Sequence, residues 1–354
     1  MEKKRSFVVI GAGVAGLTAA IALTELGHAP VVVDIASAPS HKLCGEFLSP
    51  GCIDTLKAWN IHPHPISKAS IATPNRSIEF ILPKCAGALS HMELDPQLWQ
   101  RAESQGSIFM TGAGVKEIIP RNANTPHHHI TLSSGVEIQC TDLIIATGRI
   151  PSLSKTAFKP KYKAFKAHFT NIPIHDTVML FASKEAYMGV APVSKDVCNI
   201  AGLVSFSEFE KHKNIEIFFS HMISESKLAS AYLSERQNLF PSLMTADVPE
   251  FGCKSPPPWI HTYLIGDAAA TIPPTTGNGL SMAIASGLMA AHYANAGNYS
   301  GYRSAWSKRF YTSILCGKAL HSIMMRPTLT DGTLRGIALF PKLAHAFYRL
   351  TRSS

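Results

Sequence analysis

The chain has 354 residues, of which 46% are hydrophobic and 16% are charged, which is typical of a globular enzyme and excludes a disordered chain. Its cysteines are odd in number, scattered and without a C-x-x-C pair, so we predict neither disulfides nor a metal site and expect a reducing, cytoplasmic location. The net charge is +9, but no nucleic-acid-binding motif accompanies it, so nucleic acid is not an expected partner.

The stretch from Phe7 to Asp34 predicts a dinucleotide-binding unit. Four apolar residues, 7–10, predict a strand buried on both faces, and Gly11, Gly13 and Gly16 follow in G-x-G-x-x-G spacing before a helix. In this motif the first glycine makes the turn, the second lets the backbone approach a pyrophosphate, and the third permits close packing of the helix on the strand. A second strand ends in Asp34, where a carboxylate accepts hydrogen bonds from a ribose. The basic residues at 3–5 before the first strand imitate a signal peptide, but we expect no such peptide because a cleavage pattern is missing.

The chain then alternates between two kinds of pattern. A helix is expected after Pro50, a loop over 60–65, strands over 70–73 and 77–82, and a helix with Asp95 as its N-cap. Two strands form a hairpin around 133–135, and we expect the preceding triplet 127–129 of histidines to be an exposed hairpin end rather than a metal site. Residues 142–148 predict a buried strand that returns beside the first one. Alternating strands over 159–204, a helical region over 206–243 and a proline-rich linker at 255–258 follow.

A second loop of cofactor-binding type lies near residue 270. The strand at 263–265 leads into Gly266-Asp267, a Pro/Gly loop extends to Gly279, and a helix of small residues starts at Leu280. The start of that helix suits the edge of a reduced flavin that becomes negative, and Asp267 can accept hydrogen bonds from a ribityl chain. This second loop favours FAD over NAD as the bound nucleotide.

With these blocks in place, the chain resembles the FAD-dependent oxidoreductases of the aromatic-hydroxylase (group A flavin monooxygenase) and geranylgeranyl-reductase superfamily. The blocks are the fingerprint from Gly11 to Asp34, the segment from Cys44 to Pro50, and the loops from Gly266 to Gly279. Three departures from the superfamily stand out. His91 stands where an arginine is frequent, Arg149 interrupts a Gly-Asp-Gly pattern, and Asn278 replaces a frequent acid.

The resemblance implies an α/β fold with a Rossmann-like FAD-binding domain, whose parallel sheet is like that of glutathione reductase. An inserted mixed β-sheet forms the substrate domain, and a C-terminal helical tail follows. We place the FAD-binding domain at 1–68, 92–155 and 254–300, the substrate domain at 69–91 and 156–253, and a basic helical region at 301–354. The expected cofactor-binding residues are Gly11, Gly13, Val14, Ala15, Gly16, Asp34, Lys42, Cys44, Gly45, Val115, Thr147, Gly148, Gly266, Asp267, Pro274, Gly277, Asn278, Gly279 and Leu280.

Two reactions fit this pattern, both with NADH or NADPH as a transient reductant of FAD. The preferred one is monooxygenation, in which a flavin C4a-hydroperoxide hydroxylates or epoxidises an apolar small molecule. The alternative is reduction or desaturation of a carbon–carbon double bond in a lipophilic substrate, for which Cys44, Tyr187 and His168 are the candidate proton donors. Each of these three also fits an ordinary structural role, and a non-catalytic FAD-bound redox or interaction module stays open as a third alternative.

The C-terminal region carries most of the net positive charge. From Tyr302 to Ser354 there are nine Lys or Arg residues and one acid, Asp331. After Pro341 the apolar and basic residues separate onto different helical faces, which predicts either packing on the FAD-binding domain or peripheral contact with a membrane. The oligomeric state stays open.

Overall fold

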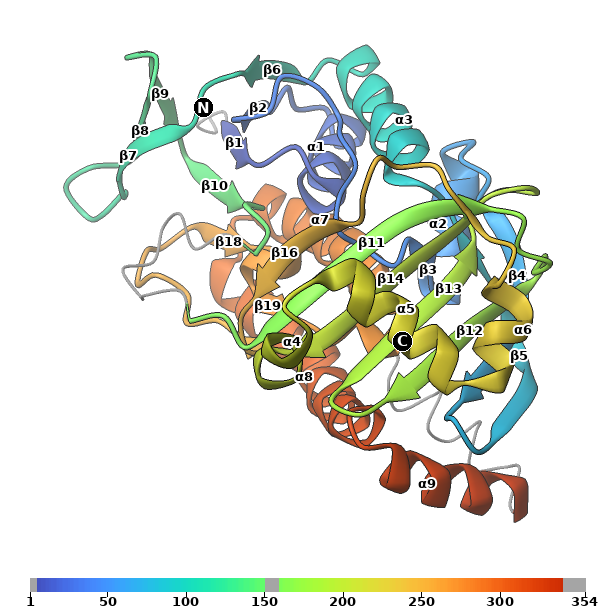
Figure 1. The fold of residues 1–354 in the computed structure, drawn as a ribbon. Helices are drawn as coiled ribbons and strands as arrows, with labels where there is room; N and C mark the ends of the chain where they lie inside the picture. The colour runs from blue at the N-terminus through green and yellow to red at the C-terminus, as the bar shows by residue number, and fades with distance from the viewer. Residues whose placement is uncertain (1–4, 150–158, 340–354) are drawn as a thin grey trace.

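The computed structural model of the chain describes residues 5–149 and 159–339 (Figure 1). Its first layer is a parallel sheet of five strands in the order β18-β10-β1-β2-β6. The strands are β1 (Phe7–Ile10), β2 (Val31–Asp34), β6 (Ile108–Thr111), β10 (Asp142–Ile145) and β18 (Thr262–Leu264). As predicted, β10 lies parallel to β1, with Val9 opposite Ile144. The carboxyl ends of these strands therefore meet at one edge, where ligands bind in sheets of this kind.

Both faces of the parallel sheet are covered, which explains why its strands are apolar at successive positions. The helices on one face are α1 (Val14–Glu25), α3 (His91–Ser104) and α7 (Gly279–Asn295). The other face carries a small antiparallel sheet of β7 (Val115–Ile119), β8 (His128–Leu132) and β9 (Glu137–Cys140). Val9 packs toward the helices and Val8 toward the small sheet, so alternate residues of β1 serve two cores.

The second large sheet is mixed and has nine strands, in the order β15-β11-β14-β13-β12-β4-β5-β3, with β16 also paired to β11. Its strands are β3 (Phe47–Leu48), β4 (His64–Ala72), β5 (Ser77–Ala88), β11 (Tyr162–Thr170), β12 (Thr177–Ser183), β13 (Ala186–Pro192), β14 (Cys198–Ser205), β15 (Gln237–Asn238) and β16 (Met244–Val248). One face is covered by α4 (Phe206–His212), α5 (Ile215–Glu225) and α6 (Lys227–Leu233), with Phe165 packed against Phe218 and Phe219. The opposite face, with Ala164 and Leu203, borders the central cavity.

Short elements connect the two sheets. Residues Pro50–Cys52 (η1) and α2 (Ile53–Ala58) form the helix expected after Pro50. The proline-rich segment at 255–258 has no regular structure and leads from β17 (Gly252–Cys253), which pairs with β19 (Ala270–Thr271), back to β18.

The C-terminal part is helical, as expected. Helix α8 (Tyr299–Met324) contacts α7, and α9 (Pro327–Leu339) reaches β5 and β12 at the lower edge of Figure 1. The basic amphipathic segment predicted after Pro341 lies outside the described residues. Among the helices that the structure describes, none combines the length and apolarity needed to cross a bilayer.

The sequence expectations were wrong at three places. The loop expected over 60–65 is shorter, because β4 begins at His64 and pairs there with Ala88. The helix α3 is capped by the Ser90 hydroxyl, which accepts from the Met92 N–H, and Asp95 lies inside the helix, where it bonds to other side chains. His128 is buried in β8 rather than exposed, and its Nδ1 accepts from the backbone N–H of Arg121.

The predicted fold class, with a Rossmann-type parallel sheet, a separate mixed sheet and a helical C-terminus, is confirmed. The division of the chain into domains stays a prediction.

Candidate functional site

A cavity of about 880 Å³ lies between the parallel sheet and the mixed sheet. One end is lined by the loop after β1, the ends of β2 and β10, and the loops before α7. The other end is lined by β4, β5, β12, β13 and β14 together with α8 and α9. The cavity therefore joins the predicted nucleotide-binding loops to the inserted sheet, as a site that holds a cofactor beside a substrate requires.

The three glycines of the first loop carry out different tasks. A Cβ on Gly11 would lie 2.4 Å from the Ala146 carbonyl oxygen, and one on Gly16 would lie 1.8 Å from the Gly11 carbonyl oxygen. These two glycines are therefore required by the fold itself. Gly13 has an extended backbone, with φ −82°, and a Cβ there would meet only the Lys42 Nζ at 3.6 Å. The fold does not require a glycine at this position, but a ligand lying against the backbone would.

The start of α1 is open to an anion. Gly13 is its N-cap, no side chain caps the first turn, and no acidic residue lies in that turn. Asp34 accepts a hydrogen bond from the Ala12 N–H at 2.5 Å and lines the same cavity. Free N–H groups at a helix start and a carboxylate at the end of β2 are the groups that bind the pyrophosphate and ribose of a dinucleotide. The residues present thus fit FAD.

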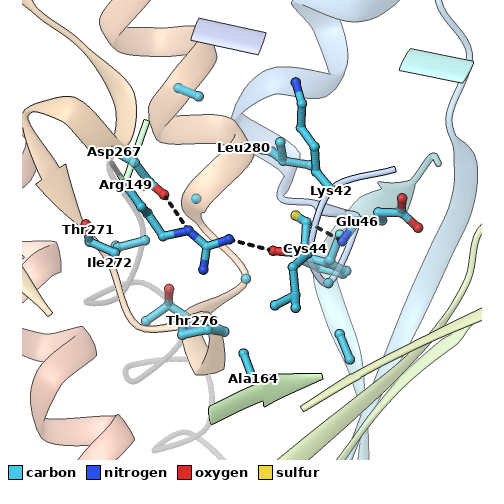
Figure 2. Close-up of a pocket in the computed structure, with 18 of the residues that line it drawn as sticks. Lys42, Cys44, Glu46, Arg149, Ala164, Asp267, Thr271, Ile272, Thr276 and Leu280 are labelled. Atoms are coloured by element: carbon cyan, nitrogen blue, oxygen red, sulfur yellow. Dashed lines mark hydrogen bonds and ion pairs between the residues drawn. The ribbon is translucent and has the colours of Figure 1, made fainter. Parts of the chain in front are cut away.

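The second loop completes this end of the cavity. It contains two short turns, η2 (Gly266–Ala268) and η3 (Pro274–Thr276), and the uncapped start of α7. Figure 2 shows Arg149 between Asp267 and the segment that carries Cys44. The Arg149 Nε lies 3.8 Å from the Asp267 carboxylate, and the guanidinium donates to the Leu43 carbonyl oxygen at 3.0 Å. Burial raises the pKa of Asp267, and the charges of Arg149 and Lys254 oppose that rise. Arg149 thus connects the two halves of the expected flavin site.

Replacement of Asp267 by asparagine is expected to weaken FAD binding about 10- to 100-fold, because a charged acceptor contributes about 1.5–3 kcal/mol to a hydrogen bond. The measurement is a fluorescence titration of the apoprotein with FAD. Asp247→Asn is the matched control. Asp247 lies on β16, pairs with Lys163 of β11 and does not line the cavity. Equal FAD affinity of D267N and the unchanged protein would remove Asp267 from the site.

Next to the flavin end lies a chain of polar side chains that starts at Cys44. The Cys44 thiol lies beside His91, and each of the two groups shifts the pKa of the other. The His91 Nδ1 lies 2.8 Å from one oxygen of Asp95, and the other oxygen accepts from the Lys42 Nζ at 2.5 Å. Cys44 and His91 both line the cavity, while Asp95 is buried behind them. Hydrogen bonds and charge from His91 outweigh the effect of burial and lower the pKa of Cys44.

A second cluster surrounds Glu46, which is fully buried. Its Oε1 accepts from the Lys166 Nζ at 2.5 Å, and its Oε2 lies 2.7 Å from the His168 Nε2. Lys166 and His168 are alternate residues of β11, so both point to the same face of the mixed sheet. The cluster therefore fixes the Cys44 segment to the inserted sheet. The ligand atoms of His41, Glu46 and His168 lie within 4.8 Å of one another, but the Lys166 ammonium on Glu46 opposes a divalent cation there.

Most of the predicted cofactor-binding residues line this one cavity. The exceptions are Gly16, which packs against Gly11, and Asn278, whose side chain accepts from the Ser49 hydroxyl at 3.0 Å. Of the candidate proton donors, Cys44 and Tyr187 line the cavity and His168 does not. Burial raises the pKa of Tyr187 well above its usual range. The sequence prediction did not anticipate that His91 and Asp95 pair beside Cys44 or that Glu46 pairs with Lys166.

Comparison with known proteins agrees with this architecture. Residues 2–164 match the pyridine nucleotide-disulphide oxidoreductase family. A menaquinone reductase of Mycolicibacterium smegmatis is 24% identical over 334 residues, which are 86% of this chain and 80% of that protein. A flavin-dependent brominase superposes with a TM-score of 0.81 at 17% identity, covering 98% of this chain and 93% of that chain.

A geranylgeranyl bacteriochlorophyll reductase-like protein from Thermoplasma acidophilum superposes with a TM-score of 0.76 at 20% identity, covering 99% of this chain and 93% of that chain. These likenesses agree with the predicted resemblance, and at these identities the two superpositions establish the fold of the chain.

Proposed function

We propose, on the premise that this chain is an FAD-dependent oxidoreductase, that it reduces a carbon–carbon double bond in a lipophilic substrate. The observation that carries the proposal is the Cys44–His91 pair, which lines the same cavity as the dinucleotide loop. Double-bond reduction needs a hydride donor on one carbon and a proton donor on the other. The chain provides a cofactor site for the first and a thiol of lowered pKa for the second.

The far end of the cavity supports an apolar substrate. It is lined mainly by aliphatic and aromatic side chains of the mixed sheet and of the two C-terminal helices. They are Ile71, Phe80, Leu82, Val178, Leu180, Leu203, Leu320, Ile323, Met324, Leu334 and Ile337. Transfer of an apolar chain from water to such a surface is favourable by about 25 cal/mol for each Å² buried. Two relatives are named for menaquinone and for geranylgeranyl bacteriochlorophyll, and both compounds carry isoprenoid chains.

Bound FAD, when reduced, supplies the hydride. The residues of the chain orient the reaction and exclude water from it. The backbone at Gly13 and the start of α1 hold the pyrophosphate end, and Asp267 and the start of α7 hold the flavin end. Cys44 lines the same cavity, and it shares one proton with His91 that can reach the Cys44 Sγ. NADH or NADPH as the reductant of FAD is part of the proposal.

Monooxygenation, the reaction that the sequence favoured, agrees less well with this site. An oxygen-activating flavin would place a peroxide beside Cys44, and thiolates are oxidised by peroxides to sulfenic acids. Because the pKa of Cys44 is lowered, its thiolate is more populated at a given pH than that of an ordinary cysteine. Cys44 would thus be oxidised during monooxygenation, whereas in double-bond reduction it can deliver the proton.

Replacement of Cys44 by alanine is expected to lower double-bond reduction about 10²- to 10⁴-fold, the usual contribution of a general acid. Dithionite-reduced enzyme is mixed anaerobically with menaquinone or a geranylgeranyl compound, and the saturated product is measured by mass spectrometry. Cys253→Ser, at an exposed site outside the cavity lining, is the matched control. Equal turnover by C44A and C253S would remove Cys44 as the proton donor. If the unchanged enzyme instead forms an oxygenated product in air and none anaerobically, the reaction is monooxygenation.

A further inference from the structure

We propose that His91 and Asp95 form a proton relay that supplies Cys44 with the proton consumed in double-bond reduction. This inference rests on the proposed function and extends it to two residues that act through Cys44 as positioning residues. The relay requires contact between neighbouring members, a fixed orientation of the imidazole and a connection to solvent.

The geometry meets the first two requirements. Asp95 lies four residues after His91 on α3, so both side chains lie on one face of the helix. The carboxylate is 2.8 Å from the Nδ1 of His91, which leaves the Nε2 for the Cys44 thiol. The backbone N–H of His91 donates to Glu46 at 2.9 Å, which fixes the first turn of the helix beside the Cys44 segment. A carboxylate that holds one imidazole nitrogen while the other contacts a thiol is the arrangement that activates nucleophilic cysteines.

The third requirement is met through Lys42. The side chain of Asp95 is 2% exposed, and that of Lys42, with which it pairs, is 40% exposed. The cluster thus extends from the cavity at Cys44, through His91 and Asp95, to the surface at Lys42. A proton can thus reach His91 from the cofactor end of the cavity, where Lys42 lies, rather than from the end lined by apolar side chains.

The charges around His91 set the pH range of the relay. Burial disfavours its charged form, but hydrogen bonds to Asp95 and Cys44 outweigh burial and raise the pKa of His91 to about 9. The other charged or titratable groups that face this cluster are His41, Lys42, Glu46 and Lys166. Glu46 is paired with Lys166 and His168. The pKa of His91 therefore depends mainly on its contacts with Asp95 and Cys44. The Cys44–His91 pair therefore holds its shared proton below about pH 9 and loses it above.

The step balances in atoms and electrons. Hydride adds to one carbon of the double bond, the π bond breaks, and its electron pair takes the proton of the Cys44 thiol to form the second C–H bond. This leaves the Cys44 thiolate beside a neutral His91, and solvent returns one proton to the pair through His91. The substrate gains two electrons and two hydrogens, and the reduced flavin, which the reductant regenerates, is oxidised.

The relay is tested first on the thiol, without turnover. The FAD-loaded protein is treated with iodoacetamide from pH 5 to 10, and the labelling of the Cys44 peptide is followed by mass spectrometry. Since only the thiolate reacts, its labelling rate follows the pKa of Cys44. We expect His91→Gln to slow labelling of Cys44 at pH 6.5 at least about tenfold, which corresponds to a rise of one unit in the pKa of Cys44. Asp95→Asn should shift the profile in the same direction by less.

Two controls keep the result interpretable. His62→Gln alters an exposed histidine whose ring bonds to Asn60, and it should leave the profile unchanged. Labelling of the exposed Cys253 in each variant reports reagent activity. An unchanged Cys44 profile in both His91→Gln and Asp95→Asn would overturn the relay. If the profile shifts but the unchanged enzyme reduces no alkene, the thiolate–imidazolium pair stands, and both the proposed reaction and the proton-supply role fall.

Discussion

Replacement of Glu46 by alanine is expected to lower the free energy of unfolding by about 3–5 kcal/mol. The reason is the ammonium group of Lys166, which is fully buried and pairs with Glu46 Oε1 at 2.5 Å. Without the carboxylate, this charge keeps only the Lys42 carbonyl oxygen as a hydrogen-bond acceptor, at 2.9 Å. His168 and the backbone N–H of His91 also lose their acceptor. Chemical denaturation at pH 7 measures the loss.

The double variant Glu46→Ala/Lys166→Met separates the pair from the rest of the cluster. Because removal of both charges also removes their desolvation costs, the double variant should recover most of the lost stability. Glu250→Ala is the matched single variant, since the pair of Glu250 with Lys161 is exposed and should contribute less than about 1 kcal/mol. Equal denaturation midpoints for E46A and E250A would contradict the expected loss of stability in E46A.

The same pair predicts how stability depends on pH. Burial raises the pKa of Glu46, but the hydrogen bond and charge of His168 and the charge of Lys166 outweigh it, so the net pKa is lowered. A carboxylate with a lowered pKa in the folded protein stabilises that state above its pKa in the unfolded chain. Its contribution should be intact at neutral pH and decline as the pH falls below about 4.5 toward the folded pKa. E46A should lack this part of the acid dependence.

The sequence predicted the nucleotide-binding end of the site because its signals are local. Gly11, Gly13 and Gly16 lie within six residues of one another, and the strand and helix that they join follow directly. The loops at Gly266 and Gly277 are equally compact. The backbone alone determines the shape of these loops, so spacing was sufficient to predict that they lie together, as they do along one cavity.

The buried cluster around Glu46 could not be predicted in the same way. Glu46 is 120 residues from Lys166 and 122 from His168, and only the topology of the mixed sheet brings them together. A weaker signal was present in β11, where Lys166 and His168 alternate with Phe165, Ala167 and Phe169. Lysine and histidine on one face of a strand whose other face is fully apolar indicate a polar partner on another element. The spacing of His91 and Asp95 was also visible, but we interpreted the aspartate as a helix cap.

The second large effect is expected at Gly13, where replacement by alanine should weaken FAD binding without destabilising the protein. The Gly13 backbone is extended, and a Cβ meets only the Lys42 Nζ at 3.6 Å. The new methyl group therefore fits the protein and can stabilise it by up to about 1 kcal/mol through the unfolded state. Against a pyrophosphate on the backbone it should cost about 2–3 kcal/mol, which is a 30- to 100-fold loss in FAD affinity.

Gly16→Ala is the matched variant. It should lower the stability of the apoprotein, whereas Gly13→Ala should lower the affinity for FAD. Its Cβ would lie 1.8 Å from the Gly11 carbonyl oxygen, so α1 must move away from β1, and we expect a loss of stability of about 3 kcal/mol or more. Thermal unfolding of the two apoproteins, with FAD titrations of each, separates ligand contact from packing. If G13A binds FAD as tightly as the unchanged protein, no pyrophosphate lies against Gly13. The nucleotide would then have to enter the cavity by another edge, and the assignment of the flavin to the Asp267 end would fail with it.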